Sequence, residues 1–386
     1  MTVGTPEPFR VTVSAEAERE LRERLRRARL PAQIPGQGWS RGTDTTYLAD
    51  FLRYWAEHYD FRRFEQRLNT WPQFRVTVGG VPLHCEHARA RSRRRQMPLL
   101  MMHGWPSSTV QFHRVIARLA DPSVDGAGPE ALGFHVVNVS LPGYGFSGNP
   151  LQTGFAVRAM AERIHLLMTT VLGYPRYAVR GSDIGGVVQQ QLALLYPDAI
   201  IGNHTSGTLR GAPLPPRSEL SEVEQRYLAD NDAWSANELA YANLHASKPQ
   251  TLGNALEDSP VALASWILEK FHAWGDTSRG VDERFGREAL IDNLMVYWLG
   301  GNATASVQFD YEFRRETRRA LGRVPQPTAV LMGMKDMVPP PRELVQRQFN
   351  LTRWNELPRG GHFLEWEEPE ITARDLREFF APLAVD

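Results

Sequence analysis

Short, almost continuously apolar segments alternate with helix-like segments from residue 98 onward. The apolar segments cover residues 99–102, 136–139, 177–179 and 328–332. A strand reads as a continuous apolar run when both faces of its sheet are covered, as in parallel sheets flanked by helices. Helical patterns over 155–172 and 187–196 lie between these runs. The alternation predicts an α/β fold with a mostly parallel sheet and right-handed crossovers.

Two regions of the chain depart from this alternation. Residues 1–95 read as a helical N-terminal region, with Ser14 as the N-cap of its first helix and a short hairpin near its end. Residues 211–290 are helical and rich in Trp, Tyr and Leu. An insertion of this kind covers the carboxyl ends of the strands, where α/β folds bind ligands. We therefore predict an N-terminal region (1–95), a core in two parts (96–210 and 291–386) and a helical cap (211–290).

The amino-acid composition limits the classes of partner and of metal site that this chain can have. The 386 residues include 44 basic and 44 acidic side chains, so the formal net charge is zero and neither nucleic acid nor a membrane is predicted as a partner. Cys85 is the single cysteine, which excludes an intrachain disulfide and a thiolate metal site. No apolar stretch approaches the roughly 20 residues of a membrane span, and we find no secretory signal. We expect a cytoplasmic protein.

The motif Gly181-Ser182-Asp183-Ile184-Gly185-Gly186 carries the first chemical signal. It follows a predicted strand and precedes a helix, which is the setting of a nucleophile elbow. The central residue is Asp183, whereas Ser182 lies one position off the centre. A carboxylate is already ionised, so it can attack an electrophilic carbon and form an ester. On this motif alone, Asp183 could also be an ordinary residue of a Gly-rich turn.

The loop His103-Gly104-Trp105-Pro106 follows the predicted strand at 99–102. In the α/β-hydrolase fold, such a loop supplies one backbone N–H of the oxyanion hole, and the residue after the nucleophile supplies the other. The predicted donors are therefore Trp105 and Ile184. His103 itself is predicted to be a structural residue of the loop.

Gly360-Gly361-His362 near the C-terminus can place an imidazole at the same sheet edge, because glycines allow a sharp loop. Asp336 follows the strand at 328–332, which gives the chain order nucleophile, acid, base of this fold. Three glutamates are alternative acids: Glu365, Glu367 and Glu368. They follow His362 and fit the start of the last helix.

These motifs, taken together, resemble those of the epoxide hydrolases of the α/β-hydrolase superfamily, in their microsomal-type branch. The resemblance extends over the whole chain and includes the segments 8–11, 141–147, 258–261 and 268–271. It implies that the chain adds water to an epoxide to give a vicinal diol, with no metal or organic cofactor. We expect the N-terminal membrane anchor of the mammalian relatives to be absent. We further expect the substrate to be a bulky or aryl epoxide of secondary metabolism or detoxification. We also expect the chain to form a homodimer.

The resemblance also implies two active-site tyrosines, Tyr241 and Tyr311. The oxygen that leaves an opening epoxide becomes an alkoxide, which phenolic O–H groups can stabilise or protonate.

Other functions remain open at this point. A haloalkane or haloacid dehalogenase shares the Asp nucleophile and the His base but needs N–H donors for a halide; Trp105 suits it, whereas Ile184 and the two tyrosines do not. A non-catalytic ligand-binding hydrolase fold is disfavoured because all three triad positions are filled. A Ser esterase is disfavoured because the elbow centre is Asp183.

Overall fold

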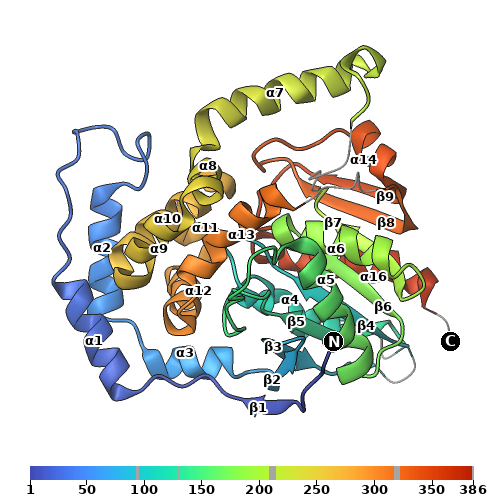
Figure 1. The fold of residues 1–386 in the computed structure, drawn as a ribbon, viewed down its shortest axis with the longest axis horizontal. Helices are drawn as coiled ribbons and strands as arrows, with labels where there is room; N and C mark the ends of the chain where they lie inside the picture. The colour runs from blue at the N-terminus through green and yellow to red at the C-terminus, as the bar shows by residue number, and fades with distance from the viewer. Residues whose placement is uncertain (93–94, 129, 208–213, 317–321, 385–386) are drawn as a thin grey trace.

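A mostly parallel sheet organises the molecule (Figure 1). In the computed structural model, the described residues (1–92, 95–128, 130–207, 214–316 and 322–384) form a nine-stranded sheet of order β1-β2-β3-β5-β4-β6-β7-β8-β9. The strands are β1 (Glu7–Phe9), β2 (Gln73–Val78), β3 (Val81–Ala88), β4 (Gln96–Met102), β5 (Gly133–Val139), β6 (Tyr177–Gly181), β7 (Ile200–Thr205), β8 (Val324–Gly333) and β9 (Phe349–Leu357). The pairs from β5 to β9 are parallel, whereas β1, β2 and β3 pair antiparallel. The predicted fold class is confirmed.

Helices cover both faces of this sheet, which explains the continuous apolar runs. They are α4 (His113–Ala120), α5 (Val157–Leu166), α6 (Asp183–Leu195), α14 (Arg342–Gln348), α15 (Leu364–Glu367) and α16 (Pro369–Phe380). In β4, Leu99 and Met101 belong to one apolar cluster with α4 and α16. Leu100 and Met102 belong to a second cluster that includes α5 and α6. Because successive side chains point to opposite faces and helices cover both, all four of these residues are buried.

A set of helices lies between β7 and β8 in the sequence (Figure 1). They are α7 (Glu222–Glu238), α8 (Ala240–Ser247), α9 (Pro249–Asp258), α10 (Pro260–Trp274), α11 (Val281–Phe285), α12 (Arg287–Gly300) and α13 (Ala303–Arg315). We refer to α7–α13 as the cap. The predicted cap boundary at residue 290 falls within α12, so that division of the chain stays a prediction.

The N-terminal helices α1 (Ala15–Arg26), α2 (Thr45–Glu57) and α3 (Phe61–Leu68) form an arm beside the cap (Figure 1). Ser14 caps α1 by accepting the Ala17 N–H at 3.1 Å, as predicted. Buried Asp292 of α12 accepts the Tyr59 O–H at 2.6 Å and two Arg67 N–H groups at 2.7 Å each. Contacts of this kind hold the arm against the cap of the same chain.

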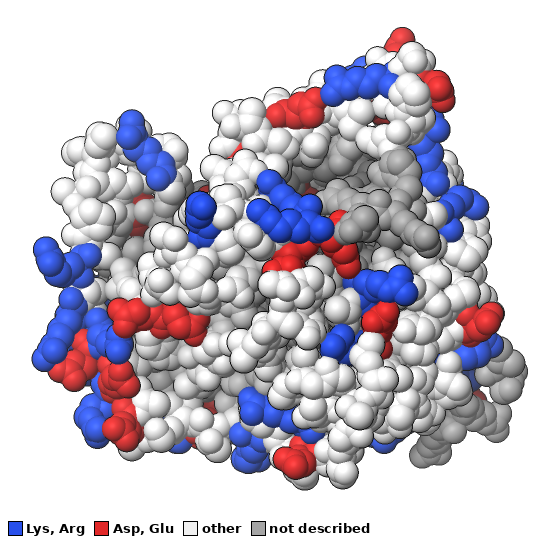
Figure 2. All heavy atoms as spheres, viewed as in Figure 1, with Lys and Arg blue, Asp and Glu red and all other residues white. Residues whose placement is uncertain are grey.

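Charges of both signs are interspersed over the face drawn in Figure 2, in keeping with the zero net charge. Within the described ranges, every helix is either too short or too polar to cross a membrane.

Candidate active site

Asp183 occupies the sharp turn between β6 and α6. Its φ of 50° makes it the only non-glycine residue with positive φ among those described. The turn is tight: a Cβ at Gly181 would lie 2.4 Å from the carbonyl oxygen of Gly185, and a Cβ at Gly185 would lie 2.1 Å from that of Met102. The glycines are therefore required by close backbone approach, and the predicted elbow is present.

The Asp183 carboxylate lies at the N-terminus of α6, where the helix dipole favours negative charge. Its Oδ1 accepts the backbone N–H of Trp105 at 3.1 Å. Gly104 permits this approach, because a Cβ there would lie 2.4 Å from the Asp183 Cβ. Ile184 stands in the first turn of α6, whose N–H groups lack acceptors within the helix. The loop after β4 thus carries a donor directed at Asp183, and the role of Ile184 as the second donor stays a prediction.

His103 has the structural role predicted for it. Its Nε2 accepts the Leu141 N–H at 3.3 Å, so its Nδ1 carries the proton and donates to the Gly104 carbonyl at 3.0 Å. Burial lowers the pKa of His103 to about 4, which keeps the ring neutral at pH 7. The ring fixes the loop that carries Trp105.

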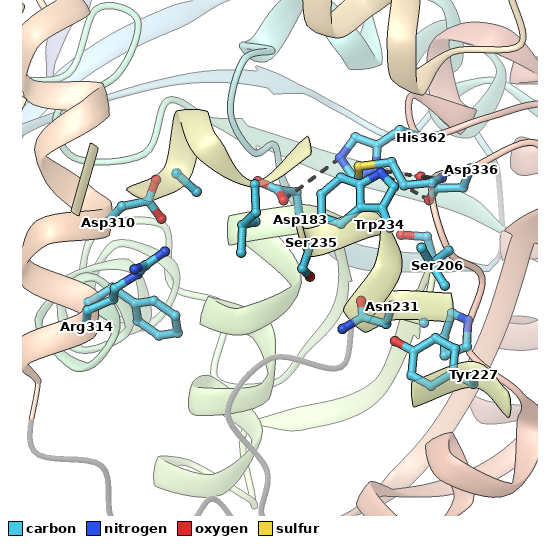
Figure 3. A pocket seen from close by; sticks show the side chains of 17 residues that line it. Asp183, Ser206, Tyr227, Asn231, Trp234, Ser235, Asp310, Arg314, Asp336 and His362 are labelled. Carbon is cyan, nitrogen blue, oxygen red and sulfur yellow. Dashed lines mark hydrogen bonds and ion pairs between the residues drawn. The ribbon is translucent and has the colours of Figure 1, made fainter. Parts of the chain in front are cut away.

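His362 lies between Asp183 and Asp336, as Figure 3 shows. Its Nδ1 is 3.1 and 3.3 Å from the two Asp336 carboxylate oxygens, and its Nε2 is 3.9 Å from Asp183 Oδ2. A proton on Nδ1 is held by Asp336, which leaves Nε2 as the basic nitrogen on the side of Asp183. The 3.9 Å separation is longer than a hydrogen bond, so the two side chains lie close together without a direct hydrogen bond at this distance.

The backbone places His362 against the cap. Its N–H donates to the Trp274 carbonyl at 2.8 Å. A Cβ at Gly361 would lie 2.4 Å from that same carbonyl oxygen, and Gly360 has a φ of 82°. The two glycines that precede His362 are therefore needed for its position.

The three glutamates considered as alternative acids bind other partners. Glu365 accepts from Arg180 and Gln111 at 2.6 Å each, deep behind the elbow. Glu367 accepts the N–H groups of Gly361 and Phe363 at 3.0 Å each and so supports the loop that carries His362. Glu368 pairs with Arg284 and Arg359 at 3.0 Å each. Asp336 is the acid that contacts His362.

A cavity of about 360 Å³ opens over Asp183 and His362 between the core and the cap. Its walls combine apolar side chains such as Trp234 with polar ones such as Tyr227. Burial and the negative charge of Asp336 raise the pKa of Tyr227, so its O–H remains a donor. Among the aromatic residues of the cap, Trp234 lines this cavity, whereas Phe271 and Trp274 are buried within α10 of the cap.

The two predicted tyrosines differ in their surroundings. The buried ring of Tyr241 stacks on Trp105 with centroids 5.3 Å apart and an interplanar angle of 12°. Tyr311 is half-buried on α13, with the Arg315 guanidinium 3.4 Å from its ring centroid. The α13 side chains that line the cavity are Asp310, Phe313 and Arg314. The structure therefore brings Tyr241 to the loop that carries Trp105 and brings Asp310, which the sequence reasoning missed, to the cavity.

Comparisons with known proteins show which family the chain resembles. Residues 6–112 match the family described as epoxide hydrolase N terminus, and residues 97–369 match the family described as alpha/beta hydrolase fold. The chain is 34% identical to a putative epoxide hydrolase of Stigmatella aurantiaca, over 97% of this chain and 85% of that protein. It is 31% identical to epoxide hydrolase 1 of Oryctolagus cuniculus, over 96% of this chain and 88% of that one.

Solved structures show the same likeness. The juvenile hormone epoxide hydrolase of Bombyx mori superposes with a TM-score of 0.88 at 30% identity and covers 98% of this chain and 95% of its own. The Aspergillus niger epoxide hydrolase superposes with a TM-score of 0.85 at 29% identity and covers 98% of this chain and 97% of its own. On these similarities, this chain belongs to the epoxide hydrolase family, in the branch of the microsomal-type and juvenile hormone enzymes, and is itself an epoxide hydrolase.

Proposed function

We propose that the reaction passes through an ester between the substrate and Asp183. The carboxylate attacks one epoxide carbon, the bond from that carbon to the ring oxygen breaks, and the oxygen takes a proton from Tyr241. His362 then removes a proton from water, and the hydroxide attacks the ester carbonyl. The N–H groups of Trp105 and Ile184 stabilise the resulting oxyanion. Collapse of this intermediate breaks the ester bond, and the departing oxygen takes the proton held by His362, which releases the vicinal diol. The carboxylic acid left on Asp183 then loses its proton, which returns to the Tyr241 oxygen and restores both side chains.

The observation that carries this proposal is the arrangement around Asp183. Its Oδ1 is 3.1 Å from the Trp105 nitrogen, its Oδ2 is 3.9 Å from His362 Nε2, and both Asp183 and His362 line the same cavity. A carboxylate so placed can be alkylated from the cavity while the base remains available for water. Ser182 has no comparable position, because its Oγ accepts the Gln111 amide at 3.1 Å behind the elbow.

Tyr241 is the better supported proton donor. Its ring lies on Trp105, next to the nucleophile, and is 7% exposed. Tyr311 stays a prediction that rests on resemblance, since Arg315 covers its ring.

The substrate class is a further part of this proposal. Trp234, Leu239 and Phe313 give the cavity an apolar side that suits a bulky or aryl epoxide. A role in secondary metabolism or detoxification, a cytoplasmic location and a homodimer also stay predictions. Gel filtration of the purified chain tests the last of these.

A single turnover in heavy-oxygen water tests the mechanism. With enzyme in excess over a racemic aryl epoxide, the first diol should carry unlabelled oxygen, and the peptide that contains Asp183 should gain label. Asp183→Asn should yield neither product nor labelled peptide. A labelled diol with an unlabelled peptide would instead mean direct attack by water, and the nucleophile assignment would be wrong.

A further inference from the structure

The wall of the cavity opposite the His362–Asp336 pair is formed by α13. In Figure 3, Asp310 and Arg314 project from this helix, and Asp183 is drawn between Asp310 and Asp336. Asp310 and Arg314 both line the cavity, and they lie one helical turn apart. A carboxylate besides those of Asp183 and Asp336 therefore faces the space in which the substrate must react, and the proposed mechanism gives it no task.

The Asp310 carboxylate is held in place by buried His245. The His245 Nδ1 is 3.1 Å from Asp310 Oδ2, and the Trp266 indole N–H donates to His245 Nε2 at 3.1 Å. An indole nitrogen can only donate, so Nε2 must accept and the proton of the neutral ring must be on Nδ1. His245 therefore donates to Asp310 but brings no positive charge to it.

The carboxylate keeps unused acceptor capacity on the cavity side. An ionised carboxylate offers about four lone-pair sites, and His245 occupies one of them. Within the described part of the chain, no ion pair or hydrogen bond joins Arg314 to Asp310. Water can satisfy the remaining sites while the cavity is empty. A bound substrate displaces that water, which is costly if the substrate offers no donor in return.

Building on the proposed function, we propose that Asp310 is a specificity-determining residue that selects epoxides carrying a hydrogen-bond donor, of which a hydroxyl group is the simplest. The donor contacts the Asp310 carboxylate while the epoxide carbon faces Asp183. A site built to hydrogen-bond such a group discriminates strongly against the analogue that lacks it, because its polar group is then left unpaired.

Matched substrates test this inference on the full chain. Each pair consists of a 1,2-epoxyalkane with a terminal hydroxyl and the analogue in which a methyl group replaces that hydroxyl, with the spacer varied to find the reach to Asp310. For the best spacer, kcat/KM of the wild type should favour the hydroxyl member by about tenfold or more. Asp310→Leu should abolish or reverse this preference. Asp310→Asn, which can still accept from His245, should reduce it, and Tyr311→Phe should leave it unchanged.

Each contrary outcome is decisive. A wild-type ratio near one at every spacer, or a ratio that survives Asp310→Leu, would overturn the inference. So would a preference that Tyr311→Phe removes. If both Asp310 variants fold but hydrolyse neither member, then Asp310 takes part in the reaction itself rather than in selection. A wild type that forms no ester on Asp183 with any epoxide would defeat the proposed mechanism, a failure that the oxygen-label experiment detects independently.

Discussion

The two halves of the active site are built in different ways. In the core half, Asp183, Trp105 and His362 are placed by backbone contacts so close that Gly104, Gly185 and Gly361 cannot carry a side chain without a clash. In the cap half, Asp310 is placed by a side-chain hydrogen bond to His245 on a neighbouring helix. The core half thus has little freedom to vary, whereas the cap half can change by single substitutions. We infer that the core half fixes the nucleophile and the base of the reaction, whereas the cap half, which also carries Tyr241, sets the choice of substrate.

The largest expected effect is the loss of the base in the core half. His362→Gln should lower turnover by about 10⁴-fold, because the ester can form but water is not activated to hydrolyse it. Intact-protein mass spectrometry should show an adduct with the mass of the epoxide. His58→Gln, on a side chain that is 63% exposed, is the matched control and should leave turnover unchanged. A His362→Gln enzyme with more than a tenth of wild-type turnover would contradict the assigned role.

The next prediction tests the close backbone contacts of the turn that carries Asp183. Gly185→Ala should lower the free energy of unfolding by about 3 kcal/mol or more, since the new Cβ would lie 2.1 Å from the Met102 carbonyl oxygen. Gly128→Ala is the control, because a Cβ there meets no atom within 4 Å. Urea unfolding of both variants measures the difference. Equal stability of the two variants would show that the elbow is not constrained as described.

On the cap half, Tyr241→Phe should slow ester formation by about 10²-fold, the usual cost of removing one donor to a developing oxyanion. Tyr311→Phe should slow ester formation less, because Arg315 covers the Tyr311 ring. Rapid-quench single turnovers measure the alkylation step for both variants. A larger loss from Tyr311→Phe would reverse the order of the two tyrosines and favour the role that resemblance gives Tyr311.

The core half was predictable from the sequence for a physical reason. Asp183 and Asp336 follow apolar strands, His362 follows a pair of glycines that allow a sharp loop, and the carboxyl ends of parallel strands meet at one edge of the sheet. Asp183, Asp336 and His362 could therefore be placed together from local patterns alone. The strands β7 and β9 were missed because they lack an apolar run. In β7, Asn203 and His204 are fully buried and polar, and β9 is a half-buried edge strand.

The cap side chains that face the cavity were harder to predict from the sequence. Neighbouring residues on a helix point about 100° apart, so a resemblance that is correct to within one position cannot say whether Asp310 or Tyr311 faces the cavity. The His245–Asp310 contact joins residues that lie 65 positions apart in the sequence. No local pattern encodes a contact of this kind, and only the packing of α8 against α13 brings the two side chains together.

The smallest of these effects is a pH dependence of the folding stability, which His103 of the core half causes. Burial lowers the folded-state pKa of His103 to about 4, below the value of about 6.5 expected in the unfolded chain. Between these values the unfolded chain binds more protons than the folded one, so stability is full above pH 6.5 and falls as the pH drops toward 4. From pH 7 to pH 5, this group should cost about 2 kcal/mol. His84 and His87, whose pKa values burial lowers to about 3 and about 4, add losses of the same sign.

A comparison with His103→Gln isolates the contribution of this one ring, because the other histidines are common to both proteins. The variant should be less stable than the wild type at pH 7, since the ring bridges the Gly104 carbonyl and the Leu141 N–H. It should also lose about 2 kcal/mol less between pH 7 and pH 5. Urea titrations at the two pH values give both numbers. Parallel losses in the two proteins would mean that His103 is not held neutral, and the loop that carries Trp105 would then owe its position to Gly104 rather than to the ring.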